Sequence, residues 1–149
     1  MTGLRLFSLA IASAFLTACG EPEDTHPGQP VKQRQQAFKE IIRSFEPMGL
    51  MLKEKRYDAE KFAVIAGALA ARREAPWSHF GPETNYPPSK STAAVWSETA
   101  KFEQAKLDFM AASDRLVSAA QKHDKAAVER SYQETYESCQ ACHKHFRQR

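Results

Sequence analysis

The sequence is poor in cysteine and has no concentration of charge of one sign. It contains 3 cysteines in 149 residues, and 21 lysines and arginines are set against 18 aspartates and glutamates, for a net charge of +3. Charges of both signs are interspersed along the chain without forming blocks, which argues against nucleic acid as a partner. The length suits one domain with one hydrophobic core.

A hydrophobic run long enough to span a membrane is also lacking. The apolar stretch Leu6–Phe15 (LFSLAIASAF) is too short to cross a bilayer as a stable helix. It follows the positive charge of Arg5 and precedes several small residues, a pattern typical of secretory signal peptides. We therefore interpret residues 1–18 as a signal peptide that is removed on export.

The signal peptide is followed by a cysteine in the sequence Leu16-Thr17-Ala18-Cys19. A hydrophobic residue and two small residues before a cysteine resemble the lipobox of bacterial lipoproteins, which implies cleavage before Cys19 and a lipid on its thiol. The next residue is Gly20 rather than aspartate, which in Gram-negative bacteria favours the outer membrane. The alternative is ordinary cleavage near Ala18, with Cys19 incidental. We expect a periplasmic protein, anchored to the outer membrane by this lipid.

The segment after Cys19 is predicted to be a tether. Glu21–Pro30 (EPEDTHPGQP) is polar, rich in proline and without large apolar side chains. Such a segment has nothing to bury, so we expect residues 19–30 to be flexible and His26 to be solvated. The folded domain is expected to occupy residues 31–149.

The domain lacks strand patterns and instead contains four amphipathic stretches. Apolar residues recur at steps of three and four, which indicates helices with one buried face. The predicted helices are Val31–Lys55, Ala59–Arg72, about Trp96–Gln121 and about 125–148. Short connections within each pair imply antiparallel neighbours. The predicted fold is an all-α, up-down antiparallel four-helix bundle.

Polar residues at the helix starts and apolar residues along the helix faces refine this prediction. Asp58, Ser97 and Asp124 are the expected N-caps of the second, third and fourth helices. The buried face of the first helix is predicted to comprise Phe38, Ile41, Ile42, Phe45, Met48 and Leu52.

A long connection, Glu74–Thr92, joins the two helix pairs. Four prolines and a glycine exclude a helix through most of it. We expect Trp77, Phe80 and Tyr86 to tie it to the bundle. His79 is interpreted as a packed or surface residue rather than a metal ligand.

The remaining two cysteines lie near the C-terminus in the sequence Cys139-Gln140-Ala141-Cys142-His143. On a helix, residues three and four apart share a face, so Cys139, Cys142 and His143 are expected to point into the bundle. Arg147 would lie over the next turn. C-x-x-C-H is the attachment signature of c-type haem, in which two thiols one turn apart bond the haem vinyl groups and the histidine binds the iron.

Three other interpretations of this motif remain open at the level of sequence. A zinc site would need Cys139, Cys142, His143 and His145 around one ion, and a continuous helix does not bring them together. A thioredoxin-like motif would need a βαβ context, and a disulfide between the two cysteines would be strained in mid-helix. Haem attachment is favoured because it suits an exported protein, and His145 is then a surface residue.

The predicted domain, Val31–Arg149, resembles the cytochromes c-prime, which carry haem on the last helix of a four-helix bundle. The matching residues are C-Q-A-C-H at 139–143, F-R at 146–147, V-K-Q-R-Q at 31–35, P-W at 76–77, F-G at 80–81 and Trp96. The chain departs from the family in its lipobox, in A-A-V before Trp96 where P-E-I is common, and in a bulky Phe38.

The resemblance implies one covalent haem c with one protein ligand to its iron, His143. An apolar side chain on the first helix covers the opposite side in this family, and the matching residue is Phe38. Phenylalanine has no lone pair for iron, so the resemblance implies a five-coordinate, high-spin haem able to bind NO. Such an apolar pocket offers no hydrogen bond to bound O₂.

Further contacts with the haem follow from the same resemblance. Arg34 and Gln35 are implied to contact the haem edge or a propionate, together with Thr92. Arg147, beside His143, is implied to shape the pocket on the histidine side.

The predicted function is single-electron transfer by a periplasmic monohaem cytochrome that also binds NO, with a periplasmic redox partner. The alternative is a dedicated NO-binding or detoxification protein. We expect no enzyme activity, because no catalytic acid–base constellation is evident and Phe38 supplies neither histidine nor arginine for peroxide cleavage. Members of the family often dimerise through the first two helices, and the alanine-rich second helix is compatible with a homodimer.

Overall fold

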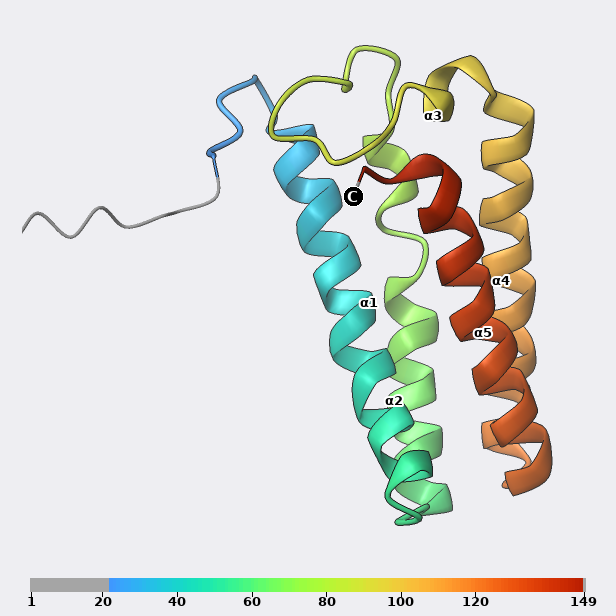
Figure 1. Cartoon of the computed structure of the whole chain (residues 1–149). Helices are drawn as coiled ribbons and strands as arrows, with labels where there is room; N and C mark the ends of the chain where they lie inside the picture. Colours follow the sequence, from blue (N-terminus) through green and yellow to red (C-terminus); the bar gives the residue numbers. More distant parts are fainter. Residues whose placement is uncertain (1–21, 149) are drawn as a thin grey trace, which may run out of the picture.

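Four long helices run up and down beside one another in a computed structural model that describes residues 22–148 (Figure 1). They are α1 (Pro30–Lys53), α2 (Ala59–Arg72), α4 (Thr99–Gln121) and α5 (Lys125–Phe146). The connection between α2 and α4 contains a short 3₁₀ helix, η1 (Trp77–His79), and one turn of helix, α3 (Ala94–Ser97). The prediction of an all-α four-helix bundle is confirmed.

The predicted signal peptide and Cys19 lie outside the described residues. Within residues 22–148, no helix is long and apolar enough to cross a membrane.

Two of the predicted helix caps are present. The Asp58 carboxylate accepts the Lys61 N–H at 3.1 Å, and the Asp124 carboxylate accepts the Ala127 N–H at 3.0 Å. Both aspartates therefore satisfy a backbone donor that the first turn leaves without a partner. The prediction for Ser97 is wrong, because its hydroxyl donates to the Ala93 carbonyl and ends α3 instead of starting α4.

The start of α1 is capped from a distance by Asp24. This side chain is 2% exposed and accepts the backbone N–H groups of Val31 at 3.0 Å and Lys32 at 3.1 Å. It also accepts the Tyr86 hydroxyl at 3.1 Å, while His26 stacks on the Tyr86 ring at 3.6 Å. The prediction of a flexible tether is therefore wrong from Asp24 onward. This polar segment is held on the bundle because its carboxylate accepts backbone N–H groups of α1 and the Tyr86 hydroxyl of the connection.

The core is built from one face of each long helix. Its fully or largely buried residues are Ile41, Met48, Phe62, Ala66, Leu69, Phe109, Leu116, Ala119, Ala120 and Val128. Ile42 is 46% exposed, so its predicted burial is wrong. A residue next to Ile41 is turned about 100° around the helix, away from the core.

The helices pack in the order α1–α2, α2–α4 and α4–α5. Contact between α1 and α5 is made by side chains: the ring of Phe45 stacks on that of Tyr132 with centroids 4.4 Å apart. Tyr132 approaches the α1 backbone so closely that a Cβ atom at Gly49 would overlap the tyrosine hydroxyl. Figure 1 shows α1 and α5 on the same side of the bundle, with the C-terminus returning toward the connection.

Candidate haem site

Cys139 and Cys142 lie one turn apart on α5 as free, half-buried thiols. Cys139 packs against the main core, and Cys142 packs against a second apolar cluster formed by Val95, Phe102 and Phe146. Burial raises the pKa of both thiols to about 11. The two sulfurs are therefore neutral near pH 7 and lie against apolar side chains.

His143 differs from the two cysteines because its side chain is exposed. It lines a shallow hollow together with Glu137, Gln140, Ala141 and Lys144. The prediction that it points into the bundle is wrong, because His143 is exposed and is turned about 100° around α5 from Cys142. Partial desolvation, and secondarily the charge of Arg147, lower the pKa of His143. The ring is therefore neutral near pH 7, the form that binds iron.

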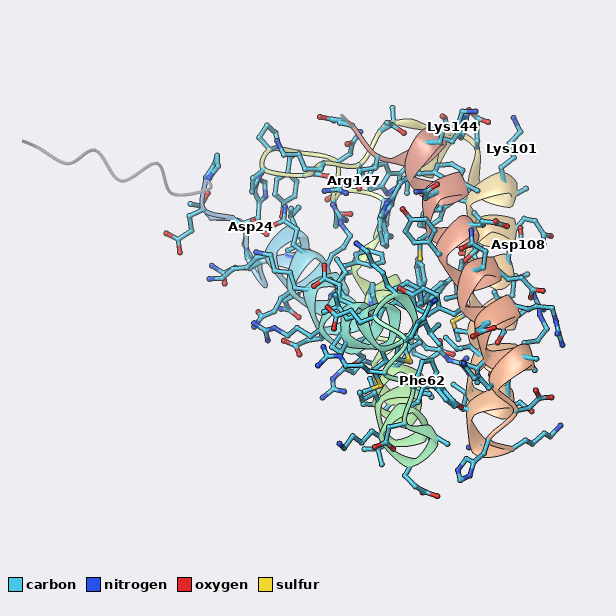
Figure 2. The ribbon with its side chains drawn as sticks, turned by 60° about the horizontal axis from the view of Figure 1, so that its bottom comes forward. Asp24, Phe62, Lys101, Asp108, Lys144 and Arg147 are labelled. Carbon is cyan, nitrogen blue, oxygen red and sulfur yellow. The ribbon has the colours of Figure 1, made fainter. Side chains whose placement is uncertain are left out.

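The last helix ends about two residues before its predicted end at 148, so Arg147 lies beyond the helix and not on its next turn. α5 ends at Phe146, and Arg147 is extended, with its N–H donating to the His143 carbonyl at 3.2 Å. Backbone bonds to the connection pull this end away: Thr92 N–H donates to Phe146 O at 3.0 Å, and Gln148 N–H donates to Lys90 O at 2.7 Å. In Figure 2 Arg147 is labelled to the left of Lys144, away from the α5 ribbon and toward the connection.

Phe38 is half-buried on α1 and lies against an aromatic wall that consists of Trp77, Phe80 and Phe102. Its ring meets Trp77 edge-on at 5.6 Å and Phe80 at 6.3 Å, and Phe80 packs on Phe102 at 4.9 Å. The predicted tying of the connection by aromatic residues is confirmed. The Trp77 Nε1–H is buried without a hydrogen-bond partner among the described residues. A buried donor of this kind is costly unless a bound group accepts from it.

Arg34 is buried beneath the connection, with 3% of its surface exposed. Its guanidinium donates to the His79 carbonyl at 2.9 Å, to the side chain and carbonyl of Thr84, and to the Ser89 hydroxyl at 2.8 Å. Its Cζ lies 4.5 Å from the centre of the Phe80 ring. Arg34 thus fastens residues 79–89 to α1, a role that the sequence did not suggest.

Gln35 and Thr92 also bind the connection and the C-terminus. The Gln35 amide donates to the Pro88 carbonyl at 3.2 Å, and the Thr92 hydroxyl donates to the His145 carbonyl at 3.0 Å. His145 is exposed and pairs with Glu98 at 3.1 Å, so its placement at the surface is confirmed. The haem contacts implied for Arg34, Gln35, Thr92 and Arg147 stay predictions.

These residues fit a covalent haem better than the other interpretations. Two free thiols one turn apart face apolar clusters, a neutral imidazole follows directly, and an aromatic wall contains an unpartnered donor. Cys139 and Cys142 are not joined in a disulfide. Within residues 22–148, no three His, Cys, Asp or Glu side chains are grouped as a metal site would require.

Comparison with known proteins agrees with this site. The family model described as Cytochrome C' matches residues 29–147. A cytochrome c' from Rubrivivax gelatinosus is 31% identical over 125 residues, covering 83% of this chain and 97% of the relative. The structure of cytochrome c prime from Shewanella frigidimarina superposes with a TM-score of 0.79 at 28% identity, covering 84% and 98% of the two chains.

A further solved structure is a nitric oxide complex of a mutant of cytochrome c prime from Alcaligenes xylosoxidans. It superposes with a TM-score of 0.78 at 28% identity and covers 85% of this chain and 100% of its own. The family match spans most of the domain, including the C-x-x-C-H helix and the aromatic wall. The chain belongs to the cytochrome c' family.

Proposed function

We propose that this protein is a periplasmic monohaem cytochrome that transfers single electrons and binds NO at a five-coordinate, high-spin iron. Membership of the family implies a covalent haem c. The observation that carries the proposal is the pair of free thiols on α5, one turn apart, facing apolar clusters beside the His143 imidazole. When bound, the haem would supply one-electron chemistry and an iron site for a small ligand.

Each residue has a distinct part in this proposal. Cys139 and Cys142 would hold the haem through thioether bonds, and His143 would be its only protein ligand. Phe38 would cover the other side with a ring that has no lone pair to donate. Arg34, Gln35 and Thr92 would contact the haem edge or a propionate, and Arg147 would shape the pocket on the His143 side. The nitric oxide complex of the Alcaligenes xylosoxidans relative supports NO as a ligand.

Optical spectra of the haem-loaded protein test this proposal. We expect broad, high-spin spectra in the oxidised and reduced forms, and a change in the reduced spectrum when NO is added. CO should bind weakly because the wall around Phe38 is closely packed. A sharp low-spin spectrum that neither gas alters would mean that a second protein ligand binds the iron, and the proposal would be wrong.

A second candidate function is NO capture without electron transfer. The apolar wall around Phe38 favours this function, because none of its side chains would compete with a small ligand for the iron. The reduced protein, mixed with membranes from the source cells, separates the two functions. Reoxidation faster than in buffer supports an electron carrier, whereas a reduced form that persists and binds NO stoichiometrically supports capture alone. In both cases we propose a non-enzymatic role.

We also propose a lipid anchor at Cys19 that holds the protein on the outer membrane, facing the periplasm. The support is the lipobox-like sequence at residues 16–19. Mass spectrometry of the exported protein should show a mature chain that begins at an acylated Cys19, and Cys19→Ser should release the protein from the membrane fraction. An unmodified Cys19 in the membrane-free fraction would contradict the anchor.

A homodimer through α1 and α2 is a further proposal. Ile42 on α1 is 46% exposed and Val64 on α2 is 74% exposed, and such apolar side chains suit an interface. Sedimentation of the protein should show a dimer that Val64→Glu dissociates. A monomer at all accessible concentrations would contradict it.

A further inference from the structure

Phe80 is held in place from two sides of the molecule. The guanidinium of Arg34 on α1 lies 4.5 Å from the centre of its ring, and the Phe38 ring meets it edge-on at 6.3 Å. The next residue, Gly81, accepts a hydrogen bond of 2.8 Å from the Trp96 indole of α3. Both the ring and the backbone beside it are therefore fixed, so Phe80 is a firm surface for Phe38 to rest on.

The segment 79–89 that begins beside Phe80 is fastened by the same arginine. Arg34 precedes Phe38 by one turn of α1 and donates hydrogen bonds to His79, Thr84 and Ser89. All these acceptors are neutral, and the guanidinium is 3% exposed. Opening the segment would strip a buried cation of its acceptors, which is costly.

We propose that Phe80 is a positioning residue that holds Phe38 over the haem, so that the segment 79–89 controls how fast a diatomic ligand enters. The inference rests on the proposed function, in which Phe38 covers the iron. A ring packed edge-on against two others has to displace them before it can leave its rotamer, because interiors are close-packed. Trp77 and Phe80 are those two rings, and both belong to the connection between α2 and α4.

A double-mutant cycle on the reduced, haem-loaded protein tests this, with CO association after flash photolysis as the measurement. Phe80→Leu removes the contact between the Phe80 and Phe38 rings. The rate of CO association should therefore rise about fivefold. In a Phe38→Ala background no ring remains to be held, so Phe80→Leu should change the rate less than about twofold. Equal effects in both backgrounds, or no effect in either, would overturn the proposal.

The role of the segment is tested by two measurements on one variant, amide hydrogen exchange and CO association. Thr84→Val together with Ser89→Ala removes two side-chain acceptors of Arg34, and also the Thr84 bond to the Gly81 carbonyl, without replacing any aromatic side chain. Amide hydrogen exchange within residues 79–89 should become faster, and CO association should become faster with it. Faster exchange with an unchanged CO rate would show that the segment does not control entry.

Phe62→Leu is the matched control, since Phe62 is fully buried on α2 and its ring packs against Tyr57. Figure 2 shows it well away from Arg147. It should lower stability without changing the CO rate, and a CO rate that rises as much as in Phe80→Leu would mean that general loosening explains both. Wild-type protein that binds neither CO nor NO would refute the proposed function and this inference together. Wild-type protein that binds CO at a rate insensitive to Phe80 would refute the inference alone.

Discussion

At the residue scale, side chains within one turn of α5 have different surroundings that match different tasks. Cys139 and Cys142 are half-buried against apolar clusters, whereas His143 is exposed beside the charge of Arg147. Buried thiols with a raised pKa stay neutral, and an imidazole with a lowered pKa stays neutral too. The two thiols and the imidazole are therefore uncharged near pH 7, so no buried charge on α5 has to be balanced by an opposite one.

Phe38→Met tests the residue that would cover the iron. A thioether has the lone pair that phenylalanine lacks, so the variant is expected to become six-coordinate and low-spin and to lose NO binding. The optical spectrum of the oxidised and reduced protein measures this.

The control for that variant is Ile41→Met, three residues along the same face of α1, where the side chain is 6% exposed in the core. Its spectrum should stay high-spin. If Phe38→Met leaves the spectrum unchanged as well, Phe38 does not lie over the iron.

At the scale of the element, α1 depends on a cap that lies outside the helix. The residue before its first turn, Gln29, makes no side-chain capping bond, and the Asp24 carboxylate accepts the N–H groups of Val31 and Lys32 instead. Burial raises the pKa of Asp24, but the hydrogen bonds from Lys32, His26, Tyr86 and Val31 together lower it below its ordinary value of 3.8. The charged form is therefore the one that stabilises the fold.

Asp24→Asn should lower the free energy of unfolding at neutral pH, because an amide carries no charge for the first turn of α1. The folded-state pKa is depressed, so this contribution is present above the unfolded pKa and is lost as the pH falls through the lower, folded one. The difference in free energy of unfolding between wild type and variant should accordingly shrink as the pH falls below 3.8, the ordinary pKa of an aspartate. Denaturant unfolding across this range measures it.

Asp108→Asn is the matched control, since this aspartate is exposed on α4 and accepts a hydrogen bond from Gln104. It should leave the stability nearly unchanged at every pH. Equal stability of Asp24→Asn and wild type at neutral pH would mean that the cap contributes nothing.

At the scale of the whole molecule, side chains join the two ends of the helix series, α1 and α5. Phe45 and Tyr132 stack across the bundle below the cysteines, and Gly49 makes room for the Tyr132 hydroxyl. At the other end, the connection is fastened to α1 by Arg34 and to the C-terminus by Thr92. The part of α5 that carries Cys139 and Cys142 thus lies between the Phe45–Tyr132 contact and the contacts of the connection.

Gly49→Ala should destabilise the protein by about 1–3 kcal/mol, because the added Cβ forces Tyr132 away from Phe45. Gly67→Ala on α2 should instead stabilise it by about 1 kcal/mol, since alanine favours a helix over glycine. No heavy atom lies within 4 Å of a Cβ at Gly67, so nothing there opposes the gain. Denaturant unfolding of the two variants measures the sign of each change in the free energy of unfolding. Changes of the same sign would contradict the steric argument.

The sequence by itself determined the features that depend on neighbours along the chain. The periodic apolar residues predicted the four helices, Asp58 and Asp124 predicted two of their starts, and C-x-x-C-H pointed to the family to which the chain belongs. Capping and helical faces involve residues within about one turn of each other, so local spacing is enough to place them.

Only the tertiary structure decided the features whose partners lie far along the chain. Asp24 is separated from Tyr86, Arg34 from Ser89, and Thr92 from Phe146 by about fifty residues or more, and no local pattern pairs them. The same holds for the exposure of Ile42 and for the early end of α5 at Phe146. A polar side chain becomes buried where folding brings it a partner, and only the packed chain determines which partner that is.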